Sequence, residues 1–234
     1  MSQTPNSDPW GAAINDYLLG NKKAKITVES NIAEDDSIPV SYLFRKFHEM
    51  PDLEQKALLI ANGNILDIGA GVGSHSLYLQ EKGMNITALE QSMKACKVMK
   101  KRGIEQVIES DFYAFTSTQK YDTILMMMNG IGIMGTVSNA TNFFNHIRLL
   151  LSPSGQFIFD SSDISYLFDD KNDMQPDYFG EISYQLKYKN VIGEKFNWLF
   201  IDEKMAKTIT EANGGNFELL AKGKHHEYLA RITF

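Results

Sequence analysis

Between residues 64 and 160, short apolar segments alternate with segments whose apolar residues recur at helical spacing. The apolar segments predict strands over residues 65–68, 85–90, 105–109, 121–128 and 156–160. The intervening segments predict helices over residues 71–82, 92–102 and 138–151. Because this alternation is typical of βαβ units, we expect a mostly parallel sheet with helices on both faces.

The two ends of the chain are less regular. We interpret the residues up to about Trp10 as a loose terminus, and the mixed, polar pattern of residues 10–37 indicates no particular element. Farther along, the pattern predicts helices over residues 39–50 and 53–61, with Asp52 and Gln55 spaced like a capping box. After residue 161 it predicts strands over 181–190 and 194–201 joined through 191–193, a helix from Asp202 to 212, and an antiparallel pair over 217–221 and 228–234.

Together these elements predict an α/β fold. We expect a Rossmann-like, doubly wound, mostly parallel seven-stranded sheet with an N-terminal helical cap and an inserted β-hairpin. The expected division is an N-terminal extension with cap helices over residues 1–62 and a ligand-binding domain over 63–234. The hairpin, at about 178–201, is rich in aromatic residues, and we expect it to form a lid or an interface, for example in a homodimer.

Composition narrows the class of protein. The chain has 234 residues, 43% of them hydrophobic, and a net charge of −6, which disfavours nucleic acid as a partner. Its single cysteine, Cys96, excludes an internal disulfide. Nothing resembles a signal peptide or a membrane span, so we expect a cytoplasmic protein. We interpret the basic run over residues 94–102 as a solvated helix face.

The segment from Asp67 to Gly73 is the main chemical signal. It follows a predicted strand and opens a helix, where glycines let the backbone approach a ligand. A dinucleotide fingerprint needs a third glycine where Ser74 stands, and a P-loop needs a Gly-Lys pair that the segment lacks. The remaining pattern suits a nucleoside without a pyrophosphate. The alternative is a glycine-rich turn that binds nothing.

Acidic residues at the ends of the next two predicted strands weaken that alternative. Glu90 follows Gly73 at close to the ~20-residue offset at which a carboxylate meets a ribose in nucleotide-binding α/β folds. Asp111 and Phe112 follow the third strand, where an acid and an aromatic ring suit a hydrogen bond to adenine and stacking on it.

Residues 64–160 resemble the class I S-adenosylmethionine (SAM)-dependent methyltransferases, in a bacterial variant of unassigned substrate. The resemblance rests on the segment Leu66–Gly73, the acids that follow it, residues 121–125 and the approach to the fifth strand; Ser154 stands where a second glycine is usual. It implies SAM as cofactor, S-adenosylhomocysteine (SAH) as product and no metal. The implied cofactor-binding residues are Asp67, Gly69, Ala70, Gly71, Gly73, Glu90, Gln91, Asp111, Phe112, Met128 and Asn129.

In this resemblance the glycine turn lies against the methionine part of SAM, and Asp67 lies near its amino group. Asn129 follows the fourth strand and offers its amide to cofactor or substrate, unless its loop is only a turn. The candidates to face the substrate are Tyr42, Arg45, His75, Gly130 and Asp160. Plainer readings are a surface arginine at Arg45, an exposed histidine at His75 and a loop cap at Asp160.

We therefore expect methyl transfer from SAM to a small molecule by in-line displacement. A positioned acceptor suffices for that reaction unless it must lose a proton, so the sequence need not contain a catalytic dyad and indicates no general base. Two alternatives stay open: a protein or nucleic-acid methyltransferase, and a non-catalytic SAM-binding interaction protein.

Overall fold

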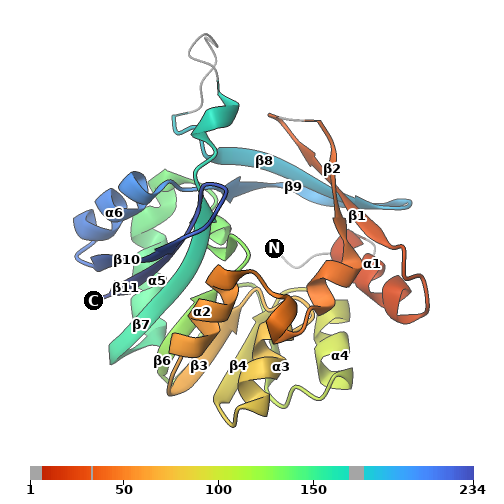
Figure 1. Cartoon of the computed structure of the whole chain (residues 1–234), viewed down its shortest axis with the longest axis horizontal. Coiled ribbons are helices and arrows are strands. Elements are labelled where there is room, and N and C mark those ends of the chain that lie inside the picture. Colours follow the sequence, from red (N-terminus) through yellow and green to blue (C-terminus); the bar gives the residue numbers. More distant parts are fainter. Residues whose placement is uncertain (1–6, 33, 169–176) are drawn as a thin grey trace. The chain divides into compact units, whose positions relative to one another are not determined.

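A seven-stranded sheet dominates the computed structural model, which describes residues 7–32, 34–168 and 177–234. The strand order is β10-β11-β7-β6-β3-β4-β5 (Figure 1). Its strands are β3 (Asn64–Ile68), β4 (Asn85–Glu90), β5 (Val107–Glu109), β6 (Tyr121–Met126), β7 (Leu151–Ser162), β10 (Asn216–Lys222) and β11 (Glu227–Thr233). β4 and β5 are parallel, as are β6 and β7, whereas β11 is antiparallel to both β7 and β10. The predicted fold class and the predicted C-terminal antiparallel pair are both confirmed.

The predicted hairpin is part of a second, four-stranded sheet with the order β2-β1-β8-β9. Its strands are β1 (Lys25–Ser30), β2 (Asp36–Pro39), β8 (Glu181–Tyr188) and β9 (Val191–Leu199). β1 pairs antiparallel with β8, placing Thr27 opposite Lys187. The predicted turn at residues 191–193 is wrong: the chain reverses between Tyr188 and Val191, where Lys189 adopts a φ of 52°. A short reversal with positive φ matches the twist of the flanking strands. The roles of lid and dimer interface stay predictions.

The α-helices are α1 (Pro9–Leu18), α2 (Asp52–Ile60), α3 (Ser74–Glu81), α4 (Met93–Lys101), α5 (Ala140–Leu150) and α6 (Glu203–Ala212). Two of the predicted helix starts are confirmed by their caps. Ser92 accepts a hydrogen bond from the N–H of Ala95, and Asp202 accepts one from the N–H of Met205. The capping box at Asp52 is wrong, because Pro51 is the N-cap of α2 and makes no side-chain cap bond.

The predicted helix over residues 39–50 is also wrong. The segment forms two 3₁₀ turns, η1 (Val40–Phe44) and η2 (Phe47–Glu49), separated by extended backbone at Arg45 and Lys46. Each turn has its own packing: Val40 of η1 joins an apolar cluster with α1, and Phe47 of η2 stacks on Tyr78 of α3 with 4.1 Å between ring centroids. Short 3₁₀ turns satisfy the same apolar spacing while letting the chain change direction.

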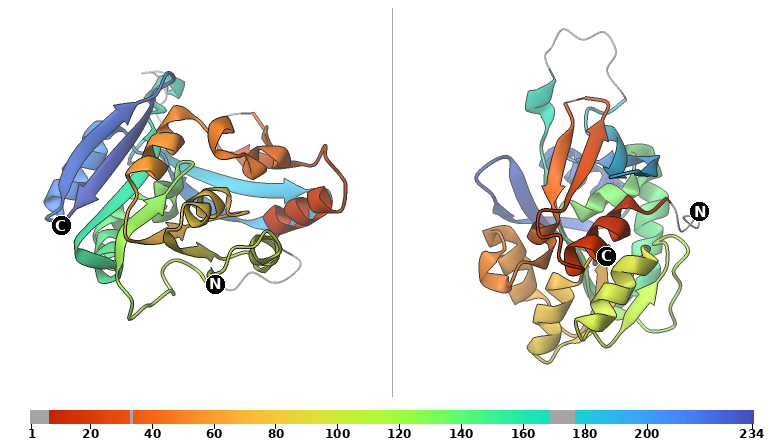
Figure 2. Two further views of the ribbon diagram at one scale, coloured as in Figure 1. Left: turned by 60° about the horizontal axis from the view of Figure 1, so that its bottom comes forward. Right: turned by 90° about the vertical axis from the view of Figure 1, so that its right-hand side faces the viewer.

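The reading of the first residues as a loose terminus is wrong from Asp8 onward. Asp8 is buried and caps α1, and Ala13 and Ile14 of that helix are fully buried. α1 contacts α4, and the two lie side by side in both views of Figure 2. The structure thus adds a helix and the strand pair β1–β2 to the helical cap expected at this end.

Contacts divide the chain into two compact units. The first contains Met1–Met50, Leu66–Phe115 and Tyr184–Phe196, and the second contains Pro51–Ile65, Thr116–Ser183 and Asn197–Phe234. In the second unit the core is aromatic, with Phe143, Phe144, Phe157 and Phe159 buried. The predicted boundary at residue 62 stays a prediction. None of the helices that the structure describes has the length and apolar character to cross a bilayer.

Candidate cofactor site

The turn between β3 and α3 is a tight loop in which three glycines have left-handed backbone. The φ angles are 72° at Gly69, 58° at Gly71 and 75° at Gly73. The N–H of Gly69 donates to the carbonyl oxygen of Leu89 over 2.9 Å, which fixes the turn to the end of β4. A Cβ at Gly73 would lie 2.1 Å from Cδ1 of Ile104. The sequence Gly-x-Gly-x-Gly is therefore required by the backbone itself.

Glu90, at the end of β4, lies directly beside this turn. Its Oε2 accepts a hydrogen bond from the N–H of Gly71 over 2.9 Å, and its Oε1 accepts one from the N–H of Ser92 over 2.8 Å. Only 7% of Glu90 is exposed. Burial, helped by the charge of Asp8, raises the pKa of the Glu90 carboxyl to about 7 despite these hydrogen bonds. The group therefore exchanges its proton near neutral pH.

Asp67, at the end of β3, is more deeply buried. Its Oδ2 accepts a hydrogen bond from the hydroxyl of Ser76 over 2.6 Å. Burial raises the pKa of the Asp67 carboxyl, while the charge of His75 opposes that rise. His75 is itself buried, so the reading of this histidine as solvent-exposed is wrong. A buried imidazole beside a buried acid is stabilised by that neighbour.

The predicted adenine pair lies after β5. Oδ1 of Asp111 accepts hydrogen bonds from the N–H groups of Tyr113 and Ala114, at 2.8 and 3.2 Å, which order the turn. Phe112 is buried, with its ring centroid 4.8 Å from that of Tyr113. Gln91, next to Glu90, is exposed. The residues expected at the adenosine are thus held in the first unit on the ends of β4 and β5.

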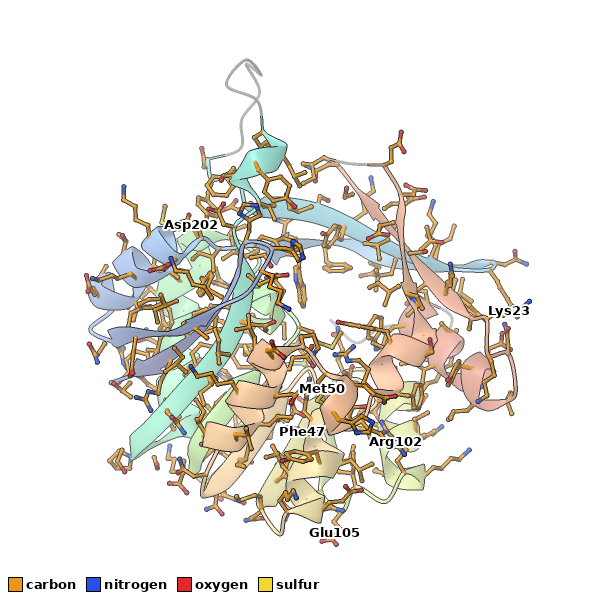
Figure 3. The ribbon with its side chains drawn as sticks, viewed as in Figure 1. Lys23, Phe47, Met50, Arg102, Glu105 and Asp202 are labelled. Atoms are coloured by element: carbon orange, nitrogen blue, oxygen red, sulfur yellow. The ribbon has the colours of Figure 1, made fainter. Side chains whose placement is uncertain are left out.

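Arg102 is a residue whose role the sequence reading missed. Its guanidinium donates to the carbonyl oxygen of Val72 over 2.5 Å and lies 5.1 Å from the centroid of the Phe44 ring. The Arg102 side chain is labelled in Figure 3. Burial lowers its pKa. The expected solvated face is therefore wrong at this residue, although Lys100 and Lys101 are exposed. Arg102 lies one helical turn beyond the buried Val98, and that spacing was the available signal.

Tyr42 and Arg45 lie at η1 and form a compact pair. The guanidinium of Arg45 donates to the carbonyl oxygen of Tyr42 over 2.6 Å and lies 3.5 Å from the centroid of its ring. Arg45 is only 9% exposed, so the plainer reading of it as a surface arginine is wrong. That Tyr42 and Arg45 contact a substrate stays a prediction.

The sequence reading also missed the start of α1. A Cβ built on Gly71 would lie 3.9 Å from Cζ2 of Trp10, so the indole borders the space that a side chain at residue 71 would occupy. The available signal was the order Asp8-Pro9, an N-cap residue followed by proline at the first helical position.

The loop after β6 belongs to the second unit. Met128 and Asn129 both have left-handed backbone, with φ of 62° and 58°, and β6 ends at Met126, earlier than predicted. The N–H of Asn129 donates to Oδ1 of Asp160 over 2.9 Å, so Asp160 does order this loop. Gly130 is buried. Among the described residues, no hydrogen-bond partner is found for the buried Oδ1 of Asn129.

These groups fit a nucleoside cofactor better than a metal. Glycines with left-handed backbone, the buried carboxylate of Glu90 and the indole of Trp10 all lie near one turn of the first unit. Across residues 7–32, 34–168 and 177–234, no group of His, Cys, Asp or Glu side chains is arranged to hold a metal ion.

Comparison with known proteins identifies the family of this chain. A protein-family model described as a methyltransferase domain matches residues 41–213. A SAM-dependent methyltransferase from Bacteroides fragilis, solved in complex with SAH, is 42% identical; the match covers 100% of this chain and 97% of that chain, with a TM-score of 0.93. A comparison with curated proteins finds no match.

More distant solved structures share the fold. The CcbJ methyltransferase from Streptomyces caelestis is 12% identical, covering 78% of this chain and 89% of that chain with a TM-score of 0.60. A SAM-dependent methyltransferase from Clostridium acetobutylicum is 14% identical, covering 76% and 86% with a TM-score of 0.54. From the family match and the close relative together, the chain belongs to the SAM-dependent methyltransferases and uses SAM as its cofactor.

Proposed function

We propose that this methyltransferase acts on a small molecule that presents an N–H or O–H group to the side chain of Asn129. The observation that carries the proposal is Oδ1 of Asn129, buried and without a hydrogen-bond partner among the described residues. A buried acceptor left unpaired costs about 1–3 kcal/mol, and a ligand that donates to it recovers that energy.

The identity of this oxygen follows from its neighbours. Nδ2 of Asn129 donates to the carbonyl oxygen of Leu199 over 3.3 Å. Turning the amide over would set Oδ1 against that carbonyl oxygen, so the unpaired atom is the acceptor. The hydrogen bond from the N–H of Asn129 to Asp160 holds the backbone in place. The side chain is thus held in one orientation, and its Oδ1 requires a hydrogen-bond donor.

Backbone strain supports the same location. Non-glycine residues in left-handed conformation cost about 1–3 kcal/mol each and cluster at functional sites. Met128, after the carboxyl end of β6, is a residue of this kind, and Asn129 beside it has the same conformation, which asparagine adopts more readily. Ligands of open α/β sheets bind at the carboxyl ends of the strands.

For the cofactor, we propose the residues of the first unit. Glu90 would accept hydrogen bonds from the ribose hydroxyls, Asp67 would lie near the amino group, and Phe112 with Asp111 would meet adenine. The turn Gly69–Gly73 and Gln91 would line the same molecule. Met128 stays a proposal for the cofactor, and Tyr42, Arg45, His75, Gly130 and Asp160 stay proposals for the acceptor.

SAM supplies a methyl group already activated on a sulfonium. The protein then has to align the acceptor atom, and positioning of this kind is worth roughly 7–11 kcal/mol in favourable cases. Asn129, by accepting an N–H or O–H, would hold the acceptor molecule in one orientation. The net charge of −6 favours a small acceptor over nucleic acid.

The test uses methyl-labelled SAM and a cell extract separated into small molecules and macromolecules. We expect label in the small-molecule fraction, whereas label confined to protein or nucleic acid would contradict the proposal. The variant Asn129→Gly tolerates the left-handed backbone and removes the acceptor oxygen. We expect its kcat/KM for the acceptor to fall about tenfold while SAH affinity stays within about threefold of wild type. Equal loss of SAH affinity would assign the oxygen to the cofactor instead.

A further inference from the structure

Asp8 joins α1 to the cofactor turn through one chain of hydrogen bonds. Its Oδ1 accepts from the N–H of Gly11 and its Oδ2 from the hydroxyl of Ser92, each over 2.7 Å. Ser92 in turn donates its N–H to Oε1 of Glu90 over 2.8 Å. Asp8, Ser92 and Glu90 are all buried. A single residue therefore separates the N-cap of α1 from the acid proposed to hold the ribose.

Gly11 makes the docking of α1 on α4 close and specific. A Cβ at this position would lie 2.3 Å from Oδ2 of Asp8, 2.5 Å from Oγ of Ser92 and 2.7 Å from Cβ of Lys94. No side chain fits there without moving one of these atoms. The two helices can therefore approach in this way only because residue 11 is glycine.

The docked helix brings an aromatic ring to the turn. Trp10 is half-buried, and its indole packs against the cluster around Ala13 and Ile14. Its Cζ2 would lie 3.9 Å from a Cβ built on Gly71, so the ring borders the space that a side chain at residue 71 would occupy. Gly71 is also the residue whose N–H bonds to Glu90. The indole thus borders the space beside the residue that donates to Glu90.

Attachment of α1 to α4 would not by itself require an acidic side chain at residue 8. The apolar contacts of Ala13 and Ile14 already attach α1, and a neutral side chain would cap the helix equally well. Asp8 instead places a second carboxylate near Glu90, whose pKa it raises. That electrostatic cost is offset if the site receives a ligand that carries positive charge, as SAM does on its sulfonium.

We propose that Trp10 is a cofactor-contacting residue and that Asp8 is its positioning residue, which docks α1 on α4 and holds the indole as one wall of the SAM pocket. The inference rests on the proposed placement of the cofactor at the glycine turn. It adds the first turn of α1, which lies outside residues 41–213 of the matched family model, to the site.

The test measures SAH binding by calorimetry in the full chain. Asp8→Ala removes both hydrogen bonds and Trp10→Leu removes the ring; we expect about tenfold weaker binding for each. Leu19→Ala, at the exposed end of α1, is the control and should bind like wild type. In a Trp198→Phe background, the emission of Trp10 should change when SAH is added. Wild-type affinity in both variants, with unchanged emission, would overturn the proposal.

A charge-only variant separates positioning from stability. Asp8→Asn can keep both hydrogen bonds but removes the charge nearest to Glu90. Ionisable groups near Glu90 in the described part of the chain include Cys96 of α4, whose pKa is raised to about 12, and Glu109 of β5, its neighbour in register. His75 of α3 acts on Asp67. We expect the pH midpoint of SAH binding to shift downward in Asp8→Asn. An unmoved midpoint would mean that Asp8 is only a helix cap. Loss of binding in Asp8→Ala together with full binding in Glu90→Ala would instead reject the cofactor placement.

Discussion

The N–H of Gly71 donates a hydrogen bond to Oε2 of Glu90 across 2.9 Å. This bond joins the glycine turn to the end of the neighbouring strand, so the backbone conformation of one and the ionisation of the other are coupled. A carboxylate accepts this hydrogen bond better than a protonated carboxyl does. The turn should therefore be most ordered when Glu90 is ionised.

The first prediction concerns pH. Folding raises the pKa of Glu90 from 4.5 to about 7. Because the folded protein binds this proton more tightly, Glu90 contributes about 3 kcal/mol to the unfolding free energy below pH 4.5, and this contribution is lost as the pH rises through 7. SAH should prefer the carboxylate, so its affinity should fall by up to about tenfold per unit below pH 7. Calorimetry between pH 5.5 and 8.5 measures this. In Glu90→Gln the binding should be weak and the slope should vanish; a slope that persists would assign the titration to another group.

The second prediction concerns the glycine turn. Gly73 and Gly83 have similar φ angles, 75° and 78°, but a Cβ meets Ile104 and Met99 at Gly73 and nothing within 4 Å at Gly83. Gly83→Ala should cost about 1 kcal/mol of unfolding free energy from backbone strain alone. Gly73→Ala should cost about 1–3 kcal/mol more, because it overfills the core. Urea unfolding measures the unfolding free energy of both variants. Equal losses would contradict the prediction, because they would show that Ile104 and Met99 accommodate the added Cβ without strain.

The third prediction concerns Arg102. Arg102→Met keeps much of the apolar stem but removes the donor to the Val72 carbonyl and to Oγ of Ser74. Since Val72 lies within the glycine turn, we expect the KM for SAM to rise about tenfold with kcat little changed. Lys101→Met, an exposed neighbour on α4, serves as the control. A fall in kcat at constant KM would contradict a role in holding the cofactor turn.

The fourth prediction concerns strain after β6. Met128 has a φ of 62°, and Met128→Gly should raise the unfolding free energy by about 1 kcal/mol because glycine adopts this conformation freely. Met93 has almost the same exposure, 38% against 36%, but starts α4. Met93→Gly should therefore destabilise the protein. Thermal unfolding distinguishes the two variants, and destabilisation by both would mean that the Met128 side chain offsets its strain through contacts.

Local signals in the sequence account for much of the fold. The alternation of apolar strands and amphipathic helices predicted the parallel sheet, because both periods are imposed by neighbouring residues. Ser92 and Asp202 predicted helix starts because N-caps act over three residues. The strand β1 escaped prediction because its partner β8 lies far along the chain and four of its six residues are polar.

The cofactor turn and the acid at Glu90 were predictable because the spacing of the motif is local. Asp8 and Trp10 were not connected to it, because the hydrogen bond from Ser92 to Asp8 and the position of the indole near the turn both depend on how α1 docks. The same is true of Arg102, whose neighbours along the helix are solvated lysines. The unpaired oxygen of Asn129 also needs the position of Leu199, which no local pattern supplies.

The placement of SAM at the glycine turn is tested most directly by titrating SAH into wild type, Glu90→Ala and Glu109→Ala. Glu109 is the matched control, because it ends the adjacent strand in register with Glu90 and is exposed. The account predicts binding to wild type, affinity about a hundredfold weaker in Glu90→Ala and affinity within about threefold of wild type in Glu109→Ala. Wild-type affinity in Glu90→Ala would contradict it.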